Sequence, residues 1–108
     1  MLKTRPYTLI DRLAIRDTNP RDSEAGMDLS RSRAWGFEVH NGHDQAVTVE
    51  LTNGATRAGT GVTATIPANT VEPIVTDIWL PSLGVRTSYA VAPTTGALSV
   101  KGWVQEES

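Results

Sequence analysis

The chain has 108 residues, enough for one domain around a single hydrophobic core. It contains no cysteine, which excludes a disulfide framework, a thiolate metal site and a thiolate nucleophile. The net charge is −2, which excludes the strongly basic composition of most nucleic-acid-binding domains.

The charge is distributed unevenly. Residues 1–34 hold seven basic and five acidic side chains, a balance of +2, whereas residues 35–108 hold three and seven, a balance of −4. Basic and acidic residues alternate in the first part, so no basic stripe for nucleic acid forms. No stretch near the start has the apolar run of a signal peptide, and no window is long enough for a membrane span. We expect a soluble protein made in the cytoplasm.

The N-terminal part is predicted to be an arm or a first edge strand over residues 1–16. Pro6 fixes the backbone near the start, and the apolar residues of segment 8–15 favour a strand. Residues 17–23 are a cluster of turn formers and predict a loop. Residues 17–108 are predicted to form a single β-sandwich domain, in which 27–29 is a short strand.

From Trp35 onwards, apolar residues recur at every second position. This period is typical of strands with one buried and one solvated face. Further strands are predicted over residues 35–39, 46–51, 62–66, 72–80, 85–91 and 97–105. The first two of these are predicted to pair as a hairpin, which would set Glu38 opposite Glu50. The fold class predicted is an all-β, antiparallel, jelly-roll-like sandwich of about eight short strands.

Residues with metal-ligand chemistry occur together only at His40, His43 and Asp44. Because they lie in a turn rich in polar residues, we interpret them as a solvated turn and expect no metal site. Asp17, Asn19 and Asp22 resemble part of a calcium loop, but the required Gly and Glu are missing from its sixth and twelfth positions, which leaves an irregular calcium site in these loops as an alternative. No nucleophile elbow or phosphate-binding loop is present. We expect no catalytic residue and no cofactor, and therefore a protein that is not an enzyme.

Trp79 and Trp103 are the aromatic residues with the most functional interest. Trp103 shares the face of Ser99 and Lys101, which the alternation makes the outer one. An aromatic residue on an outer face marks an interface or a sugar-stacking platform. We favour an interface, or a cover of folded chain, over a sugar platform.

Four segments resemble small β-sandwich virion proteins of tailed bacteriophages. They are Phe37–Asn41, Asp44–Leu51, Trp79–Arg86 and Ala92–Val100. The resemblance lies in strand-and-turn patterns and carries no active-site residue. It implies a component of a phage particle, either a head decoration (cement) protein or a minor head or tail protein.

This resemblance sets the functional expectation: a capsid decoration protein that stabilises a shell through its N-terminal arm and sandwich contacts. It implies location in a virion, with the major capsid protein or other virion proteins as partners and a homo-oligomer, as a trimer, as the assembly. The predicted interface residues are Arg5, Tyr7, Arg12, Arg16, Trp79 and Trp103. The alternative is a carbohydrate-binding or adhesion module that uses exposed tryptophans.

Overall fold

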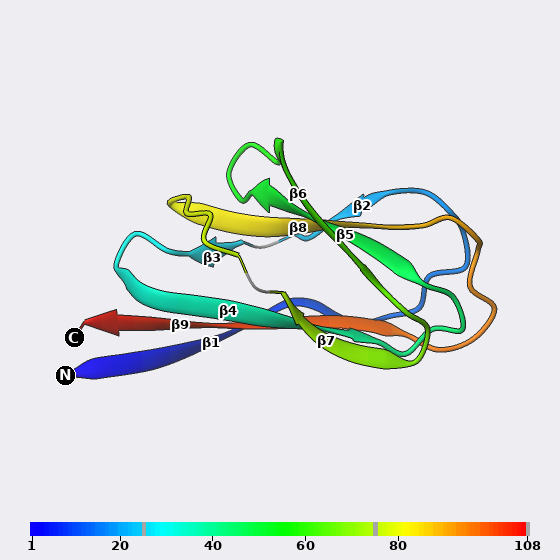
Figure 1. Ribbon diagram of the computed structural model, residues 1–108, viewed down its shortest axis with the longest axis horizontal. Helices are drawn as coiled ribbons and strands as arrows, with labels where there is room; N and C mark the ends of the chain where they lie inside the picture. Colours follow the sequence, from blue (N-terminus) through cyan, green and yellow to red (C-terminus); the bar gives the residue numbers. More distant parts are fainter. Residues whose placement is uncertain (25, 75, 108) are drawn as a thin grey trace.

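The computed structural model describes residues 1–24, 26–74 and 76–107, which form two antiparallel sheets packed face to face (Figure 1). The first sheet contains, in spatial order, β1 (Leu2–Leu13), β9 (Leu98–Glu107), β4 (Ser32–Asn41) and β7 (Thr70–Ile74). The second contains β2 (Arg21–Asp22), β8 (Ser82–Tyr89), β5 (Val47–Asn53) and β6 (Gly59–Ile66), and β3 (Met27–Asp28) also pairs with β8. The predicted all-β antiparallel sandwich is confirmed, with nine strands in the described residues instead of about eight.

The core lies between the sheets and is built from the alternating residues of the sequence. Along β9, Leu98, Val100 and Val104 are fully buried, and Val47 and Val49 of β5 face them from the opposite sheet. Each side chain of this size contributes about 1.5–3 kcal/mol when it is fully buried. The period of two in the sequence therefore arises because alternate residues of each strand face the core.

The predicted hairpin between residues 35–39 and 46–51 is wrong. β4 pairs with β7 and β9 in the first sheet, whereas β5 pairs with β6 and β8 in the second. The turn after Asn41 carries the chain from one sheet to the other, so Glu38 and Glu50 do not face each other. Alternation identifies a strand and its buried face, but it does not identify the neighbouring strand.

The predicted strand over residues 72–80 is too long. β7 ends at Ile74, Val75 lies outside the described residues, and residues 76–80 have no strand geometry. This segment crosses from the first sheet to the second at one end of the sandwich (Figure 1). It is held there because the indole N–H of Trp79 lies 3.2 Å from the carbonyl oxygen of Leu29, to which it donates.

The N-terminal residues form the edge strand β1, which pairs with β9 from Leu2 opposite Glu107 to Leu13 opposite Leu98. The register shifts twice, between Thr8 and Ile10 and again between Ile10 and Leu13. The whole molecule measures 44 × 24 × 20 Å. In the described residues there is no helix that could cross a membrane.

Candidate functional site

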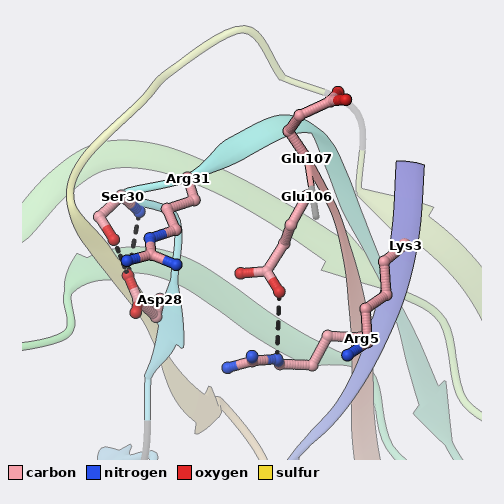
Figure 2. A pocket seen from close by; sticks show the side chains of 7 residues that line it. All are labelled: Lys3, Arg5, Asp28, Ser30, Arg31, Glu106 and Glu107. Carbon is pink, nitrogen blue, oxygen red and sulfur yellow. Dashed lines mark hydrogen bonds and ion pairs between the residues drawn. The ribbon is translucent and has the colours of Figure 1, made fainter. Parts of the chain in front are cut away.

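A charged cleft lies at the end of the sandwich where both chain termini and the β3–β4 turn come together (Figure 1). Its volume is about 430 Å³, and the close view shows charged side chains from three directions around it (Figure 2). The residues that line it are Lys3, Arg5, Asp28, Ser30, Arg31, Glu106 and Glu107. The cleft exists because the second sheet does not cover the first part of β1 and the last part of β9 at this end.

One wall of the cleft is an ion pair between the edge strand β1 and its neighbour β9 in the first sheet. Arg5 faces inward on β1, because its partner on β9, Val104, is fully buried. The Arg5 Nε lies 3.3 Å from Glu106 Oε1, and the Glu106 side chain is only 9% exposed (Figure 2). A side-chain hydrogen bond with Tyr7, followed by the charge of Glu106, raises the pKa of Arg5. The Glu106 carboxylate is thus held at the cleft wall by a fixed cation.

The opposite wall is the turn between β3 and β4. Asp28 Oδ1 accepts hydrogen bonds from the Ser30 backbone N–H at 3.0 Å and from Ser30 Oγ at 2.7 Å (Figure 2). These two bonds hold the pKa of Asp28 below its ordinary value. The carboxylate and hydroxyl fix the turn and set Arg31 at the cleft mouth.

In the described residues, cationic groups outnumber anionic groups around the cleft and its rim. Among the described residues, the lining holds Lys3, Arg5 and Arg31 against Asp28, Glu106 and Glu107, and the rim adds the N-terminal amine and Arg33. The amine lies 3.1 Å from Glu107 Oε1. Within the described part of the chain, no carboxylate lies at ion-pair distance from Lys3 or Arg31. These two side chains are therefore available to an anionic group of a partner.

The two tryptophans predicted as interface residues occupy different surfaces. Trp79 is 52% exposed, but its indole N–H is bound to Leu29 and Ser32 at the cleft end. Trp103 is 39% exposed on the outer face of the first sheet, where it lies opposite Pro6 of β1 and Gly36 of β4. A Cβ at Gly36 would meet the Trp103 ring at 2.9 Å, so the indole covers the glycine.

The basic and phenolic residues of the predicted interface are also split between the two ends. Arg5 and Tyr7 face inward near the charged cleft, and Tyr7 packs against the core. Arg12 and Arg16 lie at the opposite end of β1, where Arg16 Nη1 donates to the carbonyl oxygens of Ile15 at 2.8 Å and Gly96 at 3.1 Å. The six predicted residues do not form one continuous surface.

His43 is buried, which corrects its interpretation as part of a solvated turn. Its side chain is fully enclosed, and Nε2 accepts the backbone N–H of Ile15 at 3.1 Å. The ring proton therefore sits on Nδ1, which lies 2.6 Å from the Tyr89 hydroxyl. That hydroxyl donates to Asn41 Oδ1 at 3.1 Å, and the Asn41 amide donates to the Ile66 carbonyl at 3.2 Å. A buried polar network of His43, Tyr89 and Asn41 thus connects the loop between β1 and β2 to both sheets.

The electrostatics of this network favour neutral groups. Burial and then the charge of Arg16 lower the pKa of His43, against a smaller opposite effect of Asp44. Burial also raises the pKa of Tyr89. The polar residues around His43 in the sequence gave no signal for this role, because polar turn residues are usually exposed.

The carboxylates considered as ion ligands are bound to other groups of the chain. Asp17 Oδ2 pairs with Arg21 at 2.7 Å and Asp22 Oδ1 pairs with Arg86 at 2.9 Å. Asp44 accepts the Thr94 backbone N–H at 2.9 Å, and its bonds with Thr94 lower the pKa of the carboxyl. In residues 1–24, 26–74 and 76–107, no group of three or more His, Cys, Asp or Glu side chains is arranged to hold a metal ion.

No family model and no curated protein matches the chain. Two solved structures are similar to it in fold. A protein of Bacillus endospore appendages, described as disulfide-linked pili, matches 99% of this chain and 87% of its own with a TM-score of 0.52 and 12% identity. The crystal structure of PirA matches 95% of this chain and 93% of its own with a TM-score of 0.50 and 6% identity.

The expected role as a phage capsid decoration protein is contradicted by these matches. Two sandwiches like this one are those of a Bacillus endospore appendage protein, described as forming disulfide-linked pili, and of PirA, and neither description is of a phage shell protein. The error has a physical origin, because the segments that resembled virion proteins are strand-and-turn patterns that any antiparallel sandwich requires. The resemblance to virion proteins as a family, and a location in a virion, remain untested predictions.

Proposed function

We propose that this protein is a non-enzymatic structural subunit that assembles with copies of itself into a fibre. The observation that carries the proposal is its likeness, over 99% of the chain, to a protein of Bacillus endospore appendages described as disulfide-linked pili. The sandwich of this chain has the features of a building block: two rigid sheets, an elongated shape of 44 × 24 × 20 Å and charged ends.

Assembly of this chain is non-covalent under the proposal. The similar appendages are disulfide-linked, but this chain contains no cysteine. The subunits are then held by strand pairing and by charge, so a reducing agent has no effect on them. High salt weakens the charged contacts, because exposed ion pairs are screened within about 10 Å at 0.1 M ionic strength.

The charged cleft supplies the contact along the fibre axis. It lies at one end of the long dimension of the molecule, and Lys3 and Arg31 have no carboxylate at ion-pair distance among the described residues. At the other end, Arg16 donates to the carbonyl oxygen of Gly96, Asp17 pairs with Arg21, and the half-buried Asp44 accepts the backbone N–H of Thr94. Under the proposal, the cations Lys3 and Arg31 of the cleft meet the carboxylate of Asp44 at the far end of the next copy, and a head-to-tail contact that does not close into a ring continues into a filament.

The experiment is a pelleting assay on the purified chain at low salt. Arg31→Glu reverses a cation at the cleft mouth that has no carboxylate at ion-pair distance among the described residues. Lys101→Glu is the matched control, since Lys101 is also exposed but lies on the outer face of the first sheet. We expect the Arg31 variant to leave most of the protein in the supernatant while the control pellets like the natural chain. Equal pelleting of all three proteins would refute the cleft contact.

A further inference from the structure

The outer edges of the two sheets differ in how they are protected. β1 and β7 form the edges of the first sheet, and β6 together with the short strands β2 and β3 form those of the second. An edge strand presents unpaired backbone N–H and C=O groups that can accept another strand. Proteins block such edges with charges, proline, bulges or very short strands.

Three of these edges carry such protection. β1 contains Lys3, Arg5 and Pro6 and has two register shifts against β9. β7 contains a negative charge at Glu72 and a proline at Pro73. β2 and β3 have two residues each, too few to offer a stable pairing surface. None of these edges suits continuous pairing with a further strand.

The edge formed by β6 is different. Residues 62–66 read Val-Thr-Ala-Thr-Ile, which combines β-branched residues with no charge and no proline. Residues 63–66 pair with β5 without a break, from Ile66 opposite Val47 to Thr63 opposite Glu50. The one irregularity of β6 precedes them: Gly61 has φ of 82°, next to a register shift in the partner strand. Beyond that irregularity, residues 63–66 are regularly paired with β5 on one side, and no described strand pairs with their other side.

We propose that residues 62–66 pair antiparallel with the same residues of a second copy of this chain. Among the described edges, only β6 lacks a charge, proline or other block along residues 62–66. The edge that best matches it is therefore the same edge of a second copy. An uncharged strand also meets its own copy without repulsion between like charges.

The register follows from centring the five-residue stretch on itself. Ala64 then lies opposite Ala64 of the second copy, and Thr63 lies opposite Thr65 of the second copy. Val62, Ala64 and Ile66 point toward the core side in each chain, so the two cores remain on one side of the joined sheet. The pairs of threonines on the outer face match each other in size and hydrogen-bonding capacity.

This contact is two-fold symmetric and closes at two subunits, so it does not itself build a fibre. The inference rests on the self-assembly in the proposed function, but not on the fibre. A fibre requires the additional head-to-tail contact at the charged cleft. The two contacts use different surfaces and are separable by experiment.

Single cysteines test the register, because the chain has no cysteine of its own. Directly opposite strand residues have Cα atoms about 4.5–5.5 Å apart, within the range that a disulfide spans. Under mild oxidation we expect Ala64→Cys to form a covalent dimer, whereas the control Val71→Cys, at an exposed position on the blocked edge β7, stays monomeric. A monomeric Ala64 variant, or equal cross-linking of both variants, would overturn the proposal.

A charge placed on the open edge tests the contact without cysteine. Thr63→Lys sets a cation on each copy within the paired stretch, and Thr4→Lys places the same change on the already charged edge β1. Sedimentation velocity should show a dimer at least about tenfold weaker for the Thr63 variant than for the control. Equal dimerisation of the two variants would contradict the β6 contact.

The outcomes separate this inference from the proposed function. If fibres form and Thr63→Lys leaves both fibres and dimers unchanged, the β6 contact is wrong and the fibre proposal stands. If the natural chain forms dimers that Thr63→Lys abolishes, yet no fibre appears under any condition, the β6 contact stands and the fibre proposal fails.

Discussion

The hydroxyl of Tyr89 is the central link of the buried polar network, and its removal is the sharpest test of that network. Tyr89→Phe keeps the ring, which packs edge-on against His43 with centroids 5.0 Å apart. It leaves the His43 Nδ1–H without an acceptor in a fully buried site. Asn41 Oδ1 still accepts the His43 backbone N–H. One buried donor, the His43 Nδ1–H, is therefore left without an acceptor, and we expect a loss of about 1–3 kcal/mol in the free energy of unfolding.

The same strand offers a matched control in which the opposite result is expected. Thr87 lies two residues before Tyr89 on β8, is 1% exposed, and its Oγ1 has no hydrogen-bond partner in the described residues. Thr87→Val replaces a desolvated hydroxyl by a methyl group of nearly the same shape. We expect this change to be neutral or to stabilise the protein by about 1 kcal/mol.

Urea unfolding followed by tryptophan fluorescence at pH 7.5 measures both effects at equilibrium. The free energies of unfolding of the two variants should differ by at least about 1–2 kcal/mol. Each change removes one buried hydroxyl from β8, but only Tyr89→Phe leaves a former hydrogen-bond partner, His43, unsatisfied. Thermal unfolding should rank them in the same order, with about 4–8 °C for each kcal/mol in a domain near this size. Equal destabilisation by the two changes would refute the argument that the network, and not the buried volume, sets the loss.

Three further predictions concern pH and glycine. His43 has a folded-state pKa below its ordinary 6.5, so as the pH falls the unfolded chain binds a proton at this histidine before the folded chain does. The urea midpoint should therefore be highest above about pH 6.5 and fall as the pH is lowered to 5. An unchanged midpoint would contradict this. Gly36→Ala should displace the Trp103 ring, shifting its emission to the red with a stability loss of less than about 1 kcal/mol, and an unchanged spectrum would count against the stacking. Gly96→Ala should cost about 2 kcal/mol or more in urea unfolding, because Gly96 has φ of 88° and a Cβ there would collide with the Gly42 carbonyl; full stability would be incompatible with this turn.

The strands and their buried faces could be predicted from the sequence because they depend on local alternation. Val47, Val49 and Val100 fall where the pattern puts them, on the inward face of each strand. The pairing of strands depends on contacts far apart in the chain, which alternation does not encode. For this reason the hairpin over residues 35–51 was a wrong prediction, although both of its strands exist.

The candidate site was harder to predict, since it depends on surfaces that form only when distant segments meet. The cleft joins residues of β1, the β3–β4 turn and the last residues of β9, and Arg5 is the one predicted interface residue that lines it. His43 has the neighbours of a surface turn in sequence, yet Tyr89 and Ile15 enclose it in three dimensions. The open edge at residues 62–66 was visible in the sequence as a strand, but only the sheet order reveals that it is an edge.

Electron microscopy of the purified chain, from dilute to concentrated solution at low salt, tests the central claim of self-assembly into a fibre most directly. We expect filaments of uniform width that persist in a reducing agent, because the chain has no cysteine, and that dissociate at high salt. A field of single particles at every concentration, with a monomer or closed dimer by light scattering, would contradict the fibre proposal.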